Sequence, residues 1–268
     1  NDVAVVVPYG STLEDELEEP QIEGYIFNGW TLDGTTVTEI PRGSTGDKTV
    51  VAKWTPAQCN ATNATANASV VDNKVKCDVK CSTGYSKNGG TDTTTTFNVT
   101  STTNSESLDV ACQARTFTIS FDQNGGTGGQ TEKITVTYNG TLGKVAVPTK
   151  VNNTFTGYAY NGTKYFNANG TAAVSAYKVA SDITVTATWA EGEQHTITYE
   201  LYNGAFNGTH IEVCQENNAE ITLPTNVSKT GYTFAGWYDA ATNGSKVTTI
   251  PANACNKDLT YHAKWTAH

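Results

Sequence analysis

Apolar and polar residues alternate along several short stretches of the chain. Phe117, Ile119 and Phe121 are separated by polar residues, and the same alternation returns at 134–138 and 197–201. Because side chains two residues apart lie on the same face of a strand, each stretch predicts a strand with one apolar and one polar face. The Gly and Asn residues between these stretches are typical of the turns that connect strands.

Helical periodicity is limited to one acidic stretch near the N-terminus. Leu13 and Leu17 are four residues apart beside the carboxylates of 14–19, which predicts a single helical turn. Thr, Val and aromatic residues favour strands, whereas the helix formers Leu, Glu and Lys are too sparse for long helices. The fold class that we expect is therefore mainly β.

One seven-residue phrase recurs along the chain. Residues 24–30 and 231–237 both read Gly-Tyr-x-Phe-x-Gly-Trp, and each is followed by a strand-like stretch that closes on Trp54 or Trp265. A repeated phrase of this kind marks one supersecondary unit for each copy. The chain is therefore expected to consist of small modules in tandem.

A divergent copy of the phrase lies at 157–163 and is followed by a stretch that closes on Trp189. In this alignment Thr163 stands where the other copies have a tryptophan. We expect neighbouring aromatic residues to fill the vacated volume, namely Tyr158, Tyr160, Tyr165 and Phe166.

These repeats divide the chain into four parts: a first module at 1–56, a cysteine-stapled segment rich in Thr and Asn at 57–114, a second module at 115–191 and a third module at 192–268. Large aromatic side chains gain most from leaving water, so we expect those of the phrases and closing strands to form one small core per module. The core residues that we expect are Tyr25, Phe27, Trp30, Trp54, Trp189, Tyr232, Phe234, Trp237 and Trp265.

The six cysteines predict disulfides and an oxidising compartment, because their number is even and the chain is rich in Thr and Asn. Cys214 and Cys255 are alone in the third module, and we expect them to be joined. A loop of about forty residues closed in this way would contribute roughly 3–4 kcal/mol of stability.

The other four cysteines lie in the second part of the chain. Cys77 and Cys81 fall on one predicted strand, where roughly 13 Å would separate them at about 3.3 Å per residue. They are therefore too far apart to bond each other. Each is expected to pair with Cys59 or Cys112, and the spacing leaves the choice open.

The first module differs from the others at its start. The second and third modules begin with the alternating strands at 117–121 and 197–201, and the first begins at the equivalent of the second strand. Because unpaired strand edges are normally covered, we expect a strand from a neighbouring subunit or an upstream segment to complete the sheet. The alternative is that the first strand was simply cut away. The candidate subunit-interface strand comprises Val3, Val5, Val6 and Val7.

Together these elements resemble the Listeria–Bacteroides repeat, the B-repeat of internalin-type and related bacterial surface proteins. The resemblance is carried by residues 24–30, 52–54, 117–126, 138–142, 231–237 and 263–265. It implies a β-grasp-like fold, an extracellular or cell-surface location, and tandem modules that act as stalks or adhesive spacers without catalytic residues. The cysteine-rich segment has no counterpart in the repeat.

Charge and motifs exclude several other classes of function. A net charge of −9 disfavours partners such as nucleic acid and anionic membrane surfaces. No apolar run approaches the length of a membrane span. The four histidines have no metal-ligand spacing, and no nucleophile or phosphate-binding motif occurs. We therefore expect no metal site, no cofactor and no enzyme.

The function that we expect is structural or adhesive, outside the cell, with self-association into a homopolymer or a longer repeat chain. One alternative is an adhesin that binds a glycan or a host protein through the aromatic residues Tyr158, Tyr160 and Tyr165. Another is a non-catalytic accessory region of a larger surface enzyme.

Overall fold

The protein is built almost entirely of short strands. The computed structural model describes residues 4–8 and 10–268, and α1 (Leu13–Glu16) is the only helix among them. Thr12 caps this helix, because its Oγ1 accepts the backbone N–H of Asp15 at 3.3 Å. The prediction of a mainly β fold is confirmed, and the β-grasp-like topology stays a prediction.

The first module contains one antiparallel sheet with the order β2-β1-β3. Its strands are β1 (Tyr25–Leu32), β2 (Thr35–Val37) and β3 (Val50–Pro56). Asp33 and Gly34 connect β1 to β2 with φ angles of 50° and 79°. This left-handed backbone is what a tight Asp-Gly hairpin requires.

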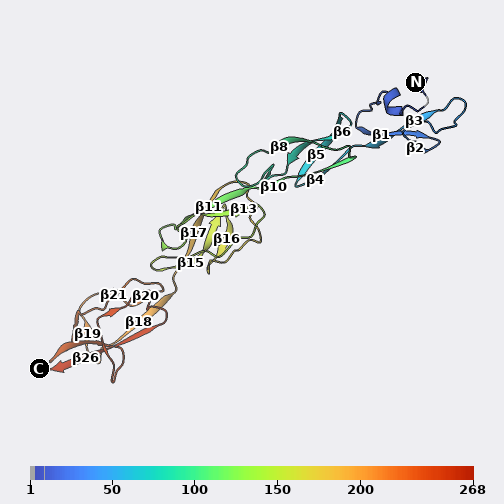
Figure 1. Ribbon diagram of the computed structural model, residues 1–268. Helices are drawn as coiled ribbons and strands as arrows, with labels where there is room; N and C mark the ends of the chain where they lie inside the picture. Colours follow the sequence, from blue (N-terminus) through green and yellow to red (C-terminus); the bar gives the residue numbers. More distant parts are fainter. Residues whose placement is uncertain (1–3, 9) are drawn as a thin grey trace. The chain divides into compact units, whose positions relative to one another are not determined.

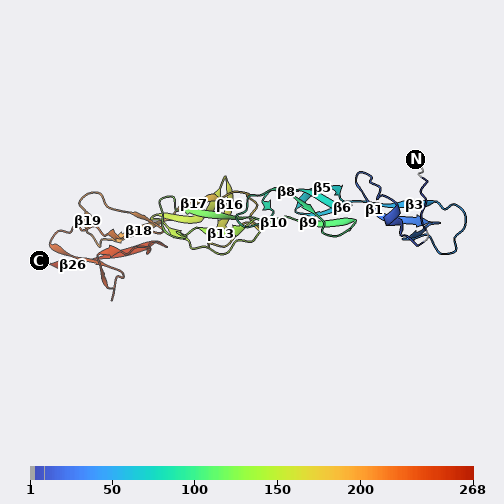
Figure 2. The same ribbon diagram turned by 45° about the horizontal axis from the view of Figure 1, so that its top comes forward.

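The cysteine-rich segment contains three small groups of strands. Its strands are β4 (Gln58–Thr62), β5 (Ala64–Val71), β6 (Lys74–Cys81), β7 (Tyr85–Ser86), β8 (Thr96–Thr100), β9 (Ser107–Ala111) and β10 (Gln113–Ala114). The antiparallel strands β5, β6 and β8 form one sheet (Figures 1 and 2). In addition, β4 pairs with β9 in parallel, and β7 pairs with β10.

The second and third modules contain five-stranded sheets with the same topology, β13-β11-β17-β15-β16 and β20-β18-β26-β23-β24. In each sheet the first strand of the module lies parallel to the last, β11 beside β17 and β18 beside β26 (Figure 1). The second module comprises β11 (Thr116–Asp122), β12 (Thr127–Gly128), β13 (Ile134–Thr137), β14 (Pro148–Thr149), β15 (Asn153–Tyr160), β16 (Thr163–Asn167) and β17 (Ile183–Glu191). The third comprises β18 (Gln194–Glu200), β19 (Ala205–Phe206), β20 (Val213–Gln215), β21 (Ile221–Thr222), β22 (Val227–Ser228), β23 (Tyr232–Tyr238), β24 (Lys246–Val247), β25 (Thr249–Ile250) and β26 (Leu259–Ala267).

The chain forms two compact units, each of which is described here by itself. One unit contains the residues through Phe117 together with Thr137–Asn139 and Lys178–Ala180. The other contains Thr118–Val136, Gly140–Tyr177 and Ser181–His268. The division of the sequence into four parts stays a prediction.

The strand that carries the repeated phrase has the same bulge in all three modules. One extra residue is inserted after Phe27 in β1, after Phe155 in β15 and after Phe234 in β23. Across the sheet these phenylalanines pair with the closing tryptophans Trp54, Trp189 and Trp265, respectively. The bulge therefore gives a common reference point for comparing the modules.

This reference point corrects the sequence alignment of the second module. Because Phe155 is equivalent to Phe234, the phrase runs over 152–158 and not over 157–163. Tyr158, rather than Thr163, stands in the place of the tryptophan. The expectation of a vacated volume at Thr163 was therefore wrong.

Candidate functional site

Each module is held together by three aromatic rings around the bulge, which we call the aromatic triad. In the third module the ring of Phe234 lies 5.2 Å from that of Trp237 and 5.4 Å from that of Trp265, measured between centroids. The equivalent distances are 5.4 and 5.5 Å in the first module (Phe27, Trp30, Trp54) and 5.0 and 5.5 Å in the second (Phe155, Tyr158, Trp189). Aromatic pairs attract at these separations in tilted and edge-to-face geometry.

The bulge explains why the triad can form. Two residues three positions apart in a regular strand point to opposite faces, but the extra residue of a bulge brings them to the same face. Gly29, Gly157 and Gly236 occupy the bulge with φ angles of 88°, 140° and 129°. Glycine adopts these backbone angles without a steric penalty, so the glycine of the phrase serves the bulge.

The expected core residues differ in burial. Trp237 is 2% exposed, and most of the others are half-buried. Tyr25 and Tyr232, however, are 42% and 41% exposed, so placing them in the core was wrong. They pair with Pro56 and Ala267 at the last positions of the closing strands, where the sheet extends beyond the triad.

A glycine lies against the closing tryptophan in the second and third modules. A Cβ atom on Gly126 would lie 2.5 Å from Cζ2 of Trp189, and one on Gly204 would lie 2.4 Å from Cζ2 of Trp265. Neither glycine has a left-handed backbone, so the requirement is close approach and not conformation. In these two modules the turn after the first strand therefore packs closely against the tryptophan ring of the last strand, which only a residue without a side chain allows.

The tyrosines proposed for glycan binding do not form an exposed platform. Tyr158 is 0% and Tyr165 is 7% exposed, and both pack with other rings inside the second module. Burial raises the pKa of both hydroxyls above the ordinary value. The expectation that these residues are exposed was therefore wrong.

Two disulfides join β6 to the β4–β9 pair within the cysteine-rich segment. Cys59 is joined to Cys77 and Cys81 to Cys112, with Cα–Cα distances of 5.9 and 5.6 Å. Cys77 and Cys81 both lie on β6 with buried side chains, so the strand connects to the β4–β9 pair at two points. The structure thereby gives the pairing that the spacing left open.

The third disulfide joins Cys214 on β20 to Cys255, which precedes β26. Both cysteines belong to the core of the third module, at 4% and 0% exposure. The buried Asn218 holds this region, because its Oδ1 accepts the backbone N–H of Cys255 at 3.0 Å.

The first module and the cysteine-rich segment share a core. Ile26 of β1 is 2% exposed and belongs to the same buried cluster as Val75, Cys77 and Cys81. Asn73, in the turn between β5 and β6, accepts the backbone N–H of Phe27 at 2.8 Å and donates to its carbonyl oxygen at 3.0 Å. One amide side chain thus bonds both backbone groups of the residue that begins the bulge.

The sheet of the first module has an open edge at β3. In the other modules the closing strand lies between two neighbours, whereas among the described residues β3 has a neighbour, β1, on one side only. Val5, Val6 and Val7 form no strand within the chain itself and Val6 is 89% exposed, so an interface strand formed by them with another subunit stays a prediction. Val3 lies outside the described residues.

A recess of about 280 Å³ lies in the first compact unit. It is lined by Glu19, Pro20, Gln21, Ile22, Glu23, Tyr25, Val70, Asp72 and Asn73. Its lining combines an exposed tyrosine ring with three carboxylates and contains no Lys, Arg or His side chain. A cationic or polyhydroxylated ligand suits this chemistry better than an anion.

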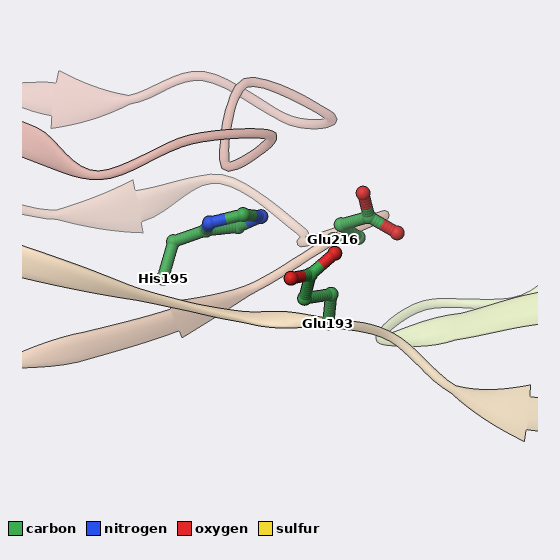
Figure 3. Close-up of side chains that lie close together, drawn as sticks. All are labelled: Glu193, His195 and Glu216. Carbon is green, nitrogen blue, oxygen red and sulfur yellow. The ribbon is translucent and has the colours of Figure 1, made fainter.

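The sequence did not reveal one group of potential ligands. Among the described residues, Glu193, His195 and Glu216 form the group of acidic and imidazole side chains whose ligand atoms all lie within 4.8 Å of one another (Figure 3). Glu216 is more than twenty residues from the other two, and only the antiparallel pairing of β18 with β20 brings it to them. No local spacing rule could have indicated this group.

Comparison with known proteins gives a family and partial relatives. The family model for the Listeria–Bacteroides repeat domain matches residues 1–53, 117–188 and 195–264. A protein of Evansella cellulosilytica, described by its name as a membrane protein, is 27% identical over 172 residues, which are 63% of this chain and 24% of that protein. Internalin H of Listeria monocytogenes is 38% identical over 69 residues, 25% of this chain and 13% of that protein.

The chain therefore spans about a quarter or less of the length of these relatives. No solved structure matches the chain. None of the helices in the described part of the chain has the length and apolar character needed to cross a membrane.

Proposed function

This chain belongs to the Listeria–Bacteroides repeat domain family, and we propose that it is a non-enzymatic spacer of a bacterial surface protein that keeps its fold under tension outside the cell. The three aromatic triads support this proposal, because in each module these large aromatic side chains pack against one another and stabilise the fold. The disulfides support the extracellular location, since they persist in oxidising compartments.

The observation that carries the proposal is the parallel pairing of the first and last strands. In the third module β18 and β26 pair in parallel from Ile197 with Leu259 to Glu200 with His262. A force applied at the two ends of the module pulls these strands along their axes in opposite directions. The hydrogen bonds between them are then loaded together in shear and not opened one by one.

The disulfide of the third module limits how far that module can extend. Cys214 and Cys255 are 41 residues apart, and a residue of stretched chain spans about 3.5 Å. The oxidised module therefore withholds roughly 140 Å of extension that the second module, which has no cysteine, releases.

Stretching single molecules of the whole chain tests the proposal. We expect one abrupt unfolding event for each of the two five-stranded modules. In oxidised protein, the extension released by the third module should be shorter by roughly 140 Å. A thiol reductant should restore the missing length, and the double variant Cys214→Ser/Cys255→Ser should release it from the start. Gradual extension without abrupt events would contradict the proposal.

We further propose that the open edge of β3 accepts an added strand with the alternating pattern of β11 and β18. The parallel partners of those strands begin at Ile183 and Leu259, six residues before the closing tryptophan in each module. The same offset from Trp54 places the added strand beside 48–51, where Val51 is 60% exposed. Backbone bonding of this kind gives affinity, and alternate side chains give specificity.

A peptide with the sequence of β11, Thr-Phe-Thr-Ile-Ser-Phe-Asp, tests the added strand. We expect it to slow hydrogen exchange of the β3 amides in the whole protein. The matched control replaces the central Ile of the peptide with proline, which removes a backbone donor. Equal protection by both peptides, or by neither, would contradict strand addition.

A second candidate function is binding of a glycan in the recess beside Tyr25. This residue is 42% exposed, and an exposed aromatic ring with neighbouring carboxylates is suited to stacking and hydrogen bonding with a sugar. Loss of glycan-array binding in Tyr25→Ala, with binding retained in Tyr232→Ala, would favour this function. Equal signals from both variants would contradict it.

A further inference from the structure

Three side chains with metal-binding atoms converge where the second and third modules join, within one compact unit. Glu193 lies in the two-residue connection between β17 and β18, His195 lies at the start of β18, and Glu216 directly follows β20. We propose that these three residues bind one divalent transition-metal ion of the zinc class and thereby fix the connection to the third module.

One ring nitrogen of His195, Nε2, is available to bind a ligand. Its Nε2 is withdrawn from solvent and has no hydrogen-bond partner, which is costly for a polar atom unless something binds it. The end of the ring points toward the two carboxylates in Figure 3. The side chain as a whole is 14% exposed, so the ring has little freedom to turn away.

The other side of the ring faces a carboxylate. Nδ1 of His195 lies 4.0 Å from Oδ1 of Asp258, and that oxygen is held by the backbone N–H of Thr196 at 2.8 Å. Metal-bound histidines commonly have a carboxylate on the ring nitrogen that does not bind the metal, because it favours the proton on that nitrogen. Nε2, on the opposite side of the ring, is the nitrogen that faces Glu193 and Glu216.

The two glutamates lack compensating charge. Neither carboxylate has an ion-pair or hydrogen-bond partner within residues 4–8 and 10–268. Two unneutralised carboxylates held near each other repel, and a divalent cation removes that repulsion. Atoms bound to one zinc ion at about 2.1 Å in tetrahedral geometry lie about 3.4 Å apart, so the exposed side chain of Glu193 must rotate inward to complete the site.

The donor set indicates the class of ion. Calcium and magnesium prefer sites made of oxygen atoms alone, whereas imidazole nitrogen suits zinc, copper and nickel. One nitrogen and two carboxylate oxygens would leave at least one position for water, as in an open zinc site.

Binding would reinforce contacts that already hold the connection. Glu216 donates its backbone N–H to the carbonyl oxygen of Glu193 at 2.9 Å, and Gly192 donates to that of Asn152 at 2.9 Å. A Cβ atom on Gly192 would lie 2.6 Å from the carbonyl oxygen of Glu216, so the two backbones approach closely only because this residue is glycine. An ion shared by Glu193 and Glu216 joins the same two segments through their side chains.

Calorimetric titration of the metal-free whole chain with zinc chloride tests the site, together with the visible absorption of bound cobalt. We expect one ion per chain, a loss of affinity of at least about tenfold in Glu193→Gln or Glu216→Gln, and no cobalt band in His195→Gln. The matched control is Glu212→Gln, which removes the same charge beside His210, 3.1 Å away, in the same module. Unchanged thermal unfolding of the metal-free variants checks that they fold.

Hydrogen exchange tests the structural consequence. Zinc should slow exchange at the Glu216 amide in the natural protein and in Glu212→Gln, and it should have no effect in Glu193→Gln/Glu216→Gln. Absence of zinc binding, or equal binding by this double variant, would overturn the site. Binding without slower exchange would overturn the fixing of the connection.

Discussion

The first and third modules carry the same aromatic triad on sheets of different size. The distance from the phenylalanine ring to the closing tryptophan is 5.5 Å in the first and 5.4 Å in the third. The third sheet has five strands and a disulfide, whereas the first has three strands and an open edge. The triad and its bulge are therefore the part of the repeat that does not depend on the first hairpin.

The two modules differ in how the indole N–H groups are satisfied. In the third module Nε1 of Trp237 donates to the carbonyl oxygen of Pro224 at 2.6 Å, and Nε1 of Trp265 donates to that of Leu201 at 2.9 Å. Nε1 of Trp30 is buried without a partner in the first module. The first module instead relies on the cysteine-rich segment, which supplies Asn73 and a shared core around Ile26.

The largest expected effect is the loss of the central tryptophan in the third module. Trp237→Ala removes a side chain that is 2% exposed together with its hydrogen bond, and it should lower the free energy of unfolding by about 4 kcal/mol. Trp30→Ala should cost about 2 kcal/mol, because Trp30 is only half-buried and its N–H has no partner. Scanning calorimetry of each variant checks the order, with the exposed Tyr232→Ala as the control. Equal losses would show that the two triads are equally supported.

Removing the disulfide should make the third module more like the first. Cys214→Ser/Cys255→Ser frees a 41-residue loop in the unfolded chain, and loop entropy predicts a loss of about 4 kcal/mol. Denaturant unfolding measures this loss, and reduced natural protein should give a similar value. A change below about 1 kcal/mol would mean that the unfolded chain is not constrained by this bond.

A methyl group added to the glycine that lies against the closing tryptophan tests the close approach of this glycine in the third module. Gly204→Ala places a Cβ 2.4 Å from the ring of Trp265 and should destabilise the third module by about 2 kcal/mol. Gly143→Ala, where a Cβ meets nothing within 4 Å, is the control and should be neutral. Thermal unfolding distinguishes the two, and equal melting temperatures would refute the close approach.

A smaller loss of stability is expected when the contact between the first module and the cysteine-rich segment is removed. Asn73→Gly keeps the left-handed backbone, at φ 53°, but removes both bonds to Phe27, so we expect a loss of about 1–2 kcal/mol in the first compact unit. Asp72→Gly changes the adjacent turn residue, at φ 49°, without affecting those bonds. If both variants unfold alike in denaturant, the turn and not the amide matters.

The smallest effect is expected at alkaline pH. Burial of the Tyr199 hydroxyl raises its pKa to about 12, and burial raises that of Tyr261 as well. Since the folded state keeps protons that the unfolded state has lost, the third module should lose stability from about pH 10 upward, until the folded pKa is reached. Tyr199→Phe removes this hydroxyl and should therefore flatten the decline in melting temperature between pH 9 and pH 11. An equal decline in the variant and the natural protein would contradict a role of Tyr199.

Much of the strand content could be predicted from the alternation of residues, but the register of the second module could not. Gly157 and Tyr158 match the first two letters of the phrase, yet Gly157 is the bulge glycine and Tyr158 replaces the tryptophan. A letter match does not show where a strand gains its extra residue. Asn243 and Gly244 lie in the connection between the paired strands β23 and β24, but this connection is longer than the two residues of a tight Asn-Gly hairpin.

Contacts between segments that are far apart in the chain could not be predicted from the sequence. The partners of Cys77 and Cys81 depend on how β4 and β9 lie against β6, which spacing does not determine. The Asn73 bonds to Phe27 join residues 46 apart. The group of Glu193, His195 and Glu216 exists only because β18 pairs with β20.

The most direct test of the tension-bearing role breaks one bond between the parallel strands of the third module. The backbone N–H of Ile197 donates to Glu212 on one side of β18, so the N–H of the next residue, Thr198, points toward β26. Single-molecule stretching should show a clearly lower unfolding force for Thr198→Pro than for the natural protein, and an unchanged force for the exposed Thr198→Ala. An unfolding force that is the same in all three proteins would contradict the account.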